Sequence, residues 1–282
     1  MFNILQKKKI APLVDEMTIS APHIAGHAKA GNFVVLRLHE KGERIPLTIA
    51  DTDKEQGTIT LLFQKIGKTT VELGMLKHGD SIKDIAGPLG HATPVSKYGH
   101  CVLVGGGIGS ATLYPILKAL KEAENKITVI LGARTKELLV WGDKFREHAN
   151  EMLPTTDDGS SGRRGLVTEV LKEVIERGPV ALVIAVGPIR MMKAVSELTR
   201  PYGIKTIVSL NPVMVEGTGM CGACRVNIGG KTRFACADGP EFDGHEVDFH
   251  ELESRLNFYK DEEGQALHLF IRKTKRKGMK LA

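Results

Sequence analysis

The cysteines of this chain are concentrated in one short segment. Three of its four cysteines, Cys221, Cys224 and Cys236, lie within sixteen residues, and Glu216 stands five positions before the first of them. If Glu216 counts as a ligand, the spacing is acid-x4-Cys-x2-Cys with a more distant third Cys, which is the spacing of plant-type [2Fe–2S] sites with a carboxylate in the first position. The segment therefore predicts a loop folded around a metal cluster, and an electron-transfer protein.

Glycines lie between these candidate ligands, at positions 217, 219 and 222. A loop that turns several backbone N–H groups toward bridging sulfides needs φ values that only glycine adopts at little cost. We therefore expect Gly217, Gly219 and Gly222 to take such conformations.

The three thiols could also serve in two other ways. The three cysteines could bind zinc with His245 as a fourth ligand, although x4 spacing fits a cluster better than the paired C-x2-C of zinc sites. A disulfide with a spare thiol is less consistent, because no signal peptide opens the chain. The fourth cysteine, Cys101, begins an apolar run and is expected to be a buried small hydrophobe.

Length and composition indicate a packed protein of more than one domain. The 282 residues correspond to about two domains at roughly 150 residues each. Hydrophobic residues make up 42% and charged residues 26%, which is ordinary for a chain with a core. No apolar run approaches the ~20 residues of a membrane helix, so we expect a cytoplasmic protein without membrane contact.

The formal charge of +6 is concentrated at the end of the chain, in Arg272, Lys273, Lys275, Arg276, Lys277 and Lys280. A nucleic-acid surface would interleave such charge with aromatic residues. Only 5% of the residues are aromatic, so we expect a solvated tail and no nucleic-acid partner. Basic surface still favours contact with nucleotide phosphates or with an acidic protein.

The chain changes character near residue 100. Before it, short apolar runs such as 32–39 and 57–63, bounded by glycine or charged turns, predict the strands of a small antiparallel barrel. After it, strand-like runs at 101–104, 127–131, 180–186 and 204–209 alternate with amphipathic stripes. The stripes are Leu113, Ile116, Leu117 and Leu120, and then Val167, Val170, Leu171, Val174 and Ile175. Such alternation predicts a parallel sheet with helices on its faces.

These patterns predict an α+β multidomain protein with four parts: a β-barrel over residues 1–97, an α/β nucleotide-binding domain over 98–212, a cluster-binding segment over 213–250, and a C-terminal helix with a basic tail over 251–282.

The α/β part holds a glycine run, Gly105, Gly106, Gly107, Ile108 and Gly109, between a strand and a helix. There backbone N–H groups and the helix dipole can approach a pyrophosphate. Ser110 stands where a third motif glycine would be, so the signal is weak alone. Two further loops end strands in this half, one with Asp157 and Asp158 and one with Gly187 and Pro188. Each also reads as an ordinary capping loop or turn.

The barrel part holds two polar segments. Pro46, Leu47 and Thr48 join a rigid proline to a hydroxyl that could bind the edge of a planar heterocycle. Gly67, Lys68, Thr69 and Thr70 offer a cation and N–H donors for phosphates. Either segment could equally be a turn of the barrel.

The order of barrel, glycine-run domain and cysteine loop resembles the ferredoxin-reductase-like family, which carries FAD in the barrel and NAD(P) in the second domain. Within that family the chain is similar to electron-transfer subunits of dihydroorotate dehydrogenase. It is still more similar to small (alpha) subunits of NADH-dependent reduced ferredoxin:NADP+ oxidoreductase, also known as sulfide dehydrogenase beta subunits. The most specific segments are 211–224, 234–240 and 242–245.

The resemblance assigns a cofactor to each motif. It implies that Pro46, Leu47 and Thr48 hold the flavin edge, that 67–70 hold the flavin phosphates, and that 105–109, Asp157, Asp158, Gly187 and Pro188 hold NAD(H). Two positions depart from the family. Ile45 stands where an arginine is usual, with Arg44 displaced by one. Glu216 stands where the dihydroorotate branch has cysteine and the bifurcating branch has an acid, usually Asp.

The resemblance further implies an FAD and [2Fe–2S] subunit of a heteromeric, electron-bifurcating NADH-dependent ferredoxin:NADP+ oxidoreductase, with Glu216, Cys221, Cys224 and Cys236 as metal ligands and no catalytic side chain. Its partners would be a large flavin and iron–sulfur subunit that binds NADP(H), and ferredoxin through the complex. The alternatives are an electron-transfer subunit of dihydroorotate dehydrogenase and a zinc-stabilised regulatory module. Asp157 and Asp158 favour NAD(H) over NADP(H), whereas Arg134, Arg163 and Arg164 argue for NADP(H).

Overall fold

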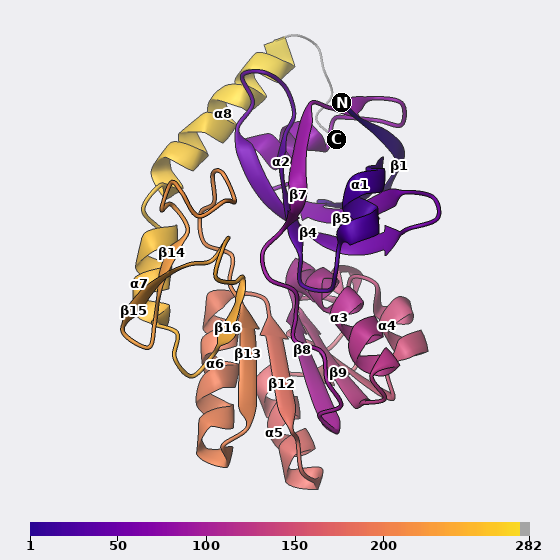
Figure 1. The fold of residues 1–282 in the computed structure, drawn as a ribbon, viewed down its shortest axis with the longest axis vertical. Helices are drawn as coiled ribbons and strands as arrows, with labels where there is room; N and C mark the ends of the chain where they lie inside the picture. Colours follow the sequence, from indigo (N-terminus) through magenta and orange to yellow (C-terminus); the bar gives the residue numbers. More distant parts are fainter. Residues whose placement is uncertain (277–282) are drawn as a thin grey trace.

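The amino-terminal part folds as an antiparallel barrel, in a computed structural model that describes residues 1–276 (Figure 1). Its strands are β1 (Phe2–Ala11), β2 (Val14–Ser20), β3 (Phe33–Arg37), β4 (Arg44–Asp53), β5 (Thr58–Gln64), β6 (Ser81–Ile82) and β7 (Asp84–Leu89). They pair in the order β6-β1-β2-β5-β4-β3-β7. Because β6 and β7 follow each other in the chain, the two edges of the sheet come together and nearly close it. The predicted barrel is confirmed.

Two short helices also belong to the barrel, α1 (Pro22–His27) and α2 (Lys68–Leu73). Each has six residues, too few for the apolar period that identifies a helix in a sequence. The interior is filled by aliphatic side chains from facing strands, among them Ile4, Met17, Leu36 and Leu61, none of which is exposed.

Strand β4 changes partners along its length. Residues from Arg44 to Thr48 pair only with β3, and β4 meets β5 only from Ile49 onward. Pro46, which has no N–H to donate, therefore sits where one side of the strand has no neighbour, the position in which a sheet tolerates proline. The consequence is an open strand edge beside Pro46, Leu47 and Thr48.

The second half is a doubly wound sheet. Its strands are β8 (His100–Gly106), β9 (Lys126–Ala133), β10 (Glu151–Thr156), β11 (Arg163–Arg164), β12 (Leu182–Val186), β13 (Lys205–Ser209) and β16 (Glu241–Asp243). They pair in the order β11-β10-β9-β8-β12-β13-β16, all parallel except for β16. Its helical elements are η1 (Gly107–Gly109), α3 (Ser110–Glu122), η2 (Lys136–Leu138), α4 (Gly142–His148), α5 (Val167–Arg177), α6 (Ile189–Thr199) and η3 (Arg200–Tyr202).

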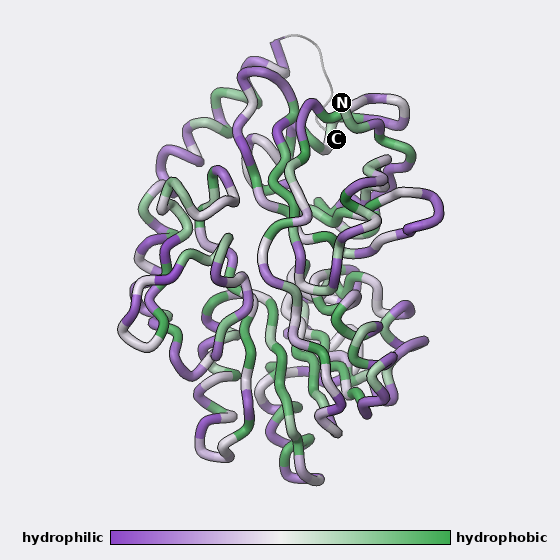
Figure 2. Tube along the Cα trace, viewed as in Figure 1, coloured by the Kyte–Doolittle hydropathy of each residue, from purple (hydrophilic) through white to green (hydrophobic). Residues whose placement is uncertain are grey.

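Helices cover both faces of this sheet, as predicted (Figure 1). Along β8, Cys101 and Leu103 pack with α3 and α4, whereas Val102 and Val104 pack with α5 and α6. A strand buried on both sides must be apolar at every position, and Figure 2 shows hydrophobic segments along the central strands.

The cysteine segment returns to the α/β sheet. After the hairpin of β14 (Arg225–Ile228) and β15 (Lys231–Phe234), β16 pairs antiparallel with β13 at the sheet edge. The sequence did not predict this strand, because three residues are too few for a strand signal. The segment is therefore tied to the nucleotide-binding domain by backbone hydrogen bonds.

Two helices follow, α7 (Phe249–Leu256) and α8 (Lys260–Arg276), and α8 runs alongside the barrel near α2 (Figure 1). Arg272, Lys273, Lys275 and Arg276 belong to α8, so the expected solvated tail is helical up to Arg276. Lys277 and Lys280 lie outside the described residues. Within residues 1–276, none of the helices has both the length and the apolar character to cross a membrane.

Candidate functional site

A cavity of about 670 Å³ lies between the barrel and the α/β sheet, within the size range of small-molecule and cofactor sites. The barrel contributes β4 residues from Ile45 to Thr48, the sheet contributes the glycine run, and a third wall comes from the chain leading to the cysteine loop. That third wall consists of Ser209, Leu210, Asn211 and Met214. All three parts of the molecule therefore meet at one cavity.

The predicted flavin-edge residues share one wall. Pro46, Leu47 and Thr48 all line the cavity, along the edge of β4 that no strand pairs. The Thr112 hydroxyl, from α3, donates to the Thr48 hydroxyl at 3.3 Å, which joins the two halves across the cavity. The open strand edge and the hydroxyl fit the polar edge of a flavin ring. Ile45 also lines the cavity, whereas Arg44 does not.

The predicted phosphate turn is only partly directed to the cavity. Of Gly67, Lys68, Thr69 and Thr70, only Thr70 lines it. The Lys68 ammonium lies 2.8 Å from a Glu43 oxygen, and the Thr69 hydroxyl donates to the other oxygen at 2.5 Å. Burial opposes ionisation of Glu43, but these hydrogen bonds hold its pKa below the usual value. The charge of Lys68 is thus already compensated by a carboxylate that the sequence did not indicate.

The glycine run lies at the reversal of strand order, between β8 and β12, where open α/β sheets bind their ligands. Gly106, Gly107, Ile108 and Gly109 line the cavity with Gly187 and Pro188 from the loop after β12. A Cβ on Gly109 would lie 2.9 Å from the Gly187 Cα, and one on Gly106 would lie 2.8 Å from the Pro188 Cδ. Glycine is therefore required here because two backbones cross in contact.

Gly105 has a different structural role from the other glycines between Gly105 and Gly109. It does not line the cavity, and a Cβ there would lie 2.9 Å from the Ser110 Cβ and 3.0 Å from the Leu131 Cδ2. It lets α3 pack closely on the sheet. The first N–H groups of α3 follow directly, and they give the cavity the positive end of a 13-residue helix.

The two acids predicted to bind the nucleotide, Asp157 and Asp158, differ in their position relative to the cavity. Asp157 lines the cavity, whereas Asp158 does not. The Asp158 carboxylate accepts from the Ser160 hydroxyl at 2.6 Å and the Ser160 N–H at 3.0 Å, and these bonds lower its pKa. Asp158 is thus a turn residue, and Asp157 is the acid available to a ligand.

The three arginines whose charge favours NADP(H), Arg134, Arg163 and Arg164, also differ in their position relative to the cavity. Arg134, directly after β9, lines the cavity. Arg163 pairs with Glu173 and lies 3.7 Å from Glu169, both on α5, and Arg164 packs over Gly159. Arg134 and Asp157 are therefore the cation and the acid that line the cavity.

The cysteine loop brings two thiols together. The Cys224 and Cys236 sulfurs are 3.1 Å apart and buried. The Gly219 N–H donates to the Cys236 sulfur at 3.1 Å, and the Cys236 N–H donates to the Cys224 sulfur at 3.4 Å. Gly217, Gly219 and Gly222 have φ of 81°, 83° and 68°, which confirms the expected use of glycine. Paired thiols with N–H groups directed at sulfur fit an iron–sulfur cluster.

The other two predicted ligands lie at the surface. Cys221 and Glu216 are exposed, and within residues 1–276 no three His, Cys, Asp or Glu side chains are grouped closely enough to hold a metal ion. Burial raises the pKa of Cys236 to about 12, and the hydrogen bond with Cys224 adds to the rise. Of the three thiols, Cys224 and Cys236 are in contact.

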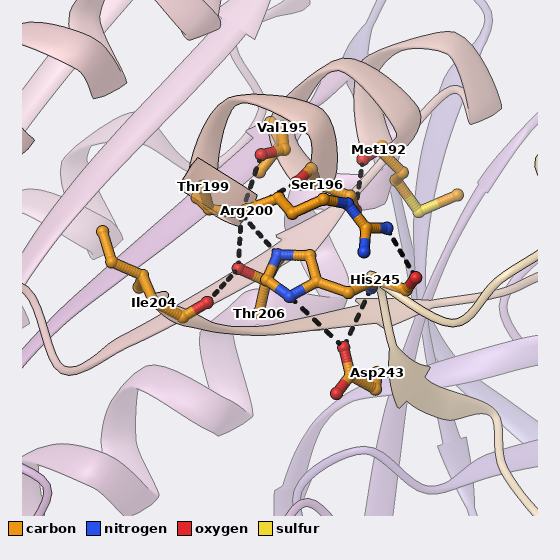
Figure 3. Close-up of polar contacts among 9 residues, drawn as sticks. All are labelled: Met192, Val195, Ser196, Thr199, Arg200, Ile204, Thr206, Asp243 and His245. Carbon is orange, nitrogen blue, oxygen red and sulfur yellow. Dashed lines mark hydrogen bonds and ion pairs between the residues drawn. The ribbon is translucent and has the colours of Figure 1, made fainter. Parts of the chain in front are cut away.

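His245, the ligand required by a Cys3His zinc site, is engaged elsewhere (Figure 3). Its Nε2 lies 3.0 Å from the Thr199 hydroxyl, and Thr199 in turn accepts from Thr206 at 2.6 Å. The Asp243 carboxylate accepts from the backbone N–H of His245 at 2.9 Å, while the imidazole Nδ1 lies 3.8 Å from it. This network fastens β16 to α6 and β13. Thr199 has no exposed surface, so the Asp–His–Thr series offers no nucleophile.

Cys101 is fully buried, as expected, and burial raises its pKa to about 11. Sequence reasoning gave no role to Thr112, Met191, Asn211 or Met214, which also line the cavity. Asn211 and Met214 lie in the segment that carried the family resemblance. Thr112 lies one helical turn after Gly109. Its distance from the glycine run in the sequence could therefore have indicated that it lines the cavity.

The sequence matches the iron–sulfur cluster binding domain of dihydroorotate dehydrogenase B over residues 211–248 and the oxidoreductase NAD-binding domain over residues 103–197. A dihydroorotate dehydrogenase B (NAD(+)) electron transfer subunit homolog from Thermotoga maritima is 50% identical over 269 residues, 95% of each chain. The dihydroorotate dehydrogenase B electron transfer subunit of Desulforamulus reducens is 33% identical over 86% of this chain and 96% of its own.

Among solved structures, an NADH-dependent reduced ferredoxin-NADP oxidoreductase, studied for flavin-based electron bifurcation, superposes with a TM-score of 0.91. That chain is 49% identical to this one, and the match covers 96% of this chain and 98% of that chain.

Proposed function

Since this chain belongs to the family of dihydroorotate dehydrogenase B electron-transfer subunits and their homologues, we propose that it is the FAD and [2Fe–2S] subunit of a heteromeric NADH-dependent ferredoxin:NADP+ oxidoreductase that works in the cytoplasm. One observation carries the proposal. A single cavity joins the open edge of β4, the crossed glycine loops and the chain that leads into the cysteine loop. The proposed flavin and nicotinamide sites would share this cavity, and the chain from Asn211 to Met214 leads from it toward the cysteine loop.

The protein contributes by positioning the cofactors relative to one another. When bound, FAD accepts a hydride from NADH and yields single electrons, and a [2Fe–2S] cluster carries one electron at a time. Pro46, Leu47 and Thr48 hold the flavin edge through the unpaired side of β4. The glycines of the β8 and β12 loops bring backbone N–H groups to the nucleotide phosphates. Glu216, Cys221, Cys224 and Cys236 hold the cluster.

The proposed partner is a large flavin and iron–sulfur subunit that binds NADP(H), and ferredoxin reacts through the complex. The acid at Glu216, in place of the cysteine of the dihydroorotate branch, supports bifurcating over dihydroorotate chemistry, and a chain of a bifurcating enzyme is 49% identical to this one. Cys221 and the neighbouring Met220, which is 86% exposed, leave the cluster loop open to a partner.

An electron-transfer subunit of dihydroorotate dehydrogenase is the second candidate, supported by the match over residues 211–248. Purification of the tagged chain from its native host separates the two. We expect a flavin and iron–sulfur subunit that binds NADP(H) to co-purify, and the complex to reduce NADP+ from NADH and reduced ferredoxin. Co-purification of a dihydroorotate-oxidising subunit would contradict the proposal.

Glu216 provides a test of the cluster assignment. Glu216→Ala is expected to lose or destabilise the cluster, because four ligands are needed and three cysteines are present nearby. Glu216→Cys should retain a cluster with an altered EPR signal, since ligand identity sets the electronic character of the iron. Glu246→Ala, an exposed acid of the same segment, is the control. An unaltered EPR signal in Glu216→Ala would make Glu216 a loop residue.

Asp157 provides a test of nucleotide preference. We expect NADH to reduce the protein faster than NADPH, because a carboxylate accepts from a ribose hydroxyl and repels a 2′-phosphate. Asp157→Asn should reduce that preference by about tenfold, because the amide keeps an acceptor but loses the charge that strengthens the hydrogen bond and repels the 2′-phosphate, a difference of about 1.4 kcal/mol. Asp158→Asn should leave it unchanged, because Asp158 binds Ser160 away from the cavity. Stopped-flow reduction decides, and a wild-type preference for NADPH would refute the assignment.

A further inference from the structure

Glu241 lies directly behind the wall of the cofactor cavity. It is the first residue of β16 and pairs with Ser209 of β13, while the Leu210 N–H donates to the Pro240 carbonyl at 2.9 Å. Ser209, Leu210 and Pro240 all line the cavity. Both the strand partner of Glu241 and the residue before it therefore belong to that wall.

Glu241 is partly buried, and only one of its two carboxyl oxygens has a hydrogen-bond partner among the described residues. Its Oε1 accepts from the Thr93 hydroxyl at 2.7 Å. Its Oε2 has no accessible surface and no hydrogen-bond partner among the described residues. The barrel closes over it at Gly31, where φ is 86° and an added Cβ would lie 3.1 Å from Oε1. A charged carboxylate at this junction lacks the donors that normally accompany burial.

The segments packed around Glu241 bring no cation to it. Their ionisable residues are Lys29 before Gly31, His91 before Thr93, Lys205 on β13 and Asp243 on β16 itself, and all four are exposed. None of them alters the Glu241 titration: burial raises the pKa of Glu241 to about 7, and only the Thr93 hydrogen bond opposes the rise. Near neutral pH, small changes in the local potential therefore decide whether Glu241 is charged.

We propose that Glu241 is a proton-exchanging carboxyl of the cofactor cavity, which binds a proton from solvent when an electron enters the cavity and releases it when the electron leaves. The inference rests on the proposed function, in which NADH supplies the electrons. The carboxylate gains one O–H bond and no electron. The negative charge that the electron adds to the cavity is therefore offset by the negative charge that Glu241 loses when it is protonated. A negative charge nearby disfavours a second one, strongly so where water is excluded. Glu241 acts through space, without contacting the cofactor.

Infrared difference spectra of the cofactor-loaded full chain, reduced with NADH at several pH values, test the proposal. Near pH 7, reduction should generate the C=O band of a protonated carboxyl, and this band should be missing in Glu241→Gln, which keeps an acceptor for Thr93. The midpoint of the Glu241 titration should rise by about one pH unit or more on reduction. Thr93→Val removes the hydrogen bond that favours the charged form, so it should raise the midpoint in both redox states.

The outcomes separate the alternatives. A band of equal size in Glu241→Gln, or a titration midpoint that reduction does not move, overturns proton exchange while the flavin and cluster spectra remain normal. A purely structural Glu241 would lower the melting temperature on substitution and give no redox-linked band, which also overturns it. A protein without flavin or cluster absorption overturns the proposed function and this inference together.

Discussion

Cys224→Ser should abolish the iron–sulfur absorption and EPR signal while leaving the flavin and its reduction by NADH within about threefold of the unmodified protein. Cys224 is 1% exposed, and its sulfur lies 3.1 Å from the Cys236 sulfur. A serine oxygen is a poor substitute for a soft thiolate at iron, and it also withdraws the sulfur to which the Cys236 N–H donates. The flavin edge lies on β4, a separate part of the fold.

Cys101→Ser is the matched control, because Cys101 is equally buried but packs under α3 with Leu103 and Leu113. It should cost stability and leave the cluster intact. A full cluster in Cys224→Ser would show that the Cys224 thiol does not hold the iron, and an intact cluster in Cys101→Ser shows that replacing a buried thiol does not by itself remove the cluster. Iron content and EPR amplitude per flavin are the measurements.

Gly109→Ala should slow reduction by NADH by about 100-fold, the order expected when bound reactants are displaced by roughly 1 Å. The added Cβ would lie 2.9 Å from the Gly187 Cα and 3.0 Å from both the Gly187 N and the Val186 carbonyl oxygen. Backbone atoms cannot rotate away as a flexible side chain can, so the two loops must separate. FAD should remain bound, because its edge is held by β4.

Gly26→Ala is the control for this substitution, since a Cβ at Gly26, in α1, meets nothing within 4 Å. Its reduction rate should equal that of the unmodified protein. Stopped-flow reduction over a range of NADH concentrations measures the effect. Wild-type kinetics in Gly109→Ala would mean that the crossed loops do not form the nicotinamide site.

The elements predicted correctly are those whose signal is local. The stripe from Leu113 to Leu120 lies within α3, and each of its four residues is fully buried. The glycines of the cysteine loop have the positive φ values expected from their spacing. In both cases neighbouring residues decide the structure, through helical periodicity in one and backbone freedom in the other.

The features that escaped prediction depend on distant partners. Lys68 is held by Glu43 across 25 residues, so its sequence position suggested a free phosphate ligand. The open edge at Pro46 exists because β4 meets β5 only beyond Thr48. The burial of Glu241 results from the contact of β16 with β13 and the barrel, which no short pattern reports.

The visible spectrum of the aerobically purified protein, with FAD and iron quantified per chain, tests the central claim most directly. We predict flavin bands superimposed on broad cluster absorption, with about one FAD and about two iron atoms per chain. Addition of NADH should bleach the flavin bands. A colourless protein that contains zinc and no flavin would contradict the account.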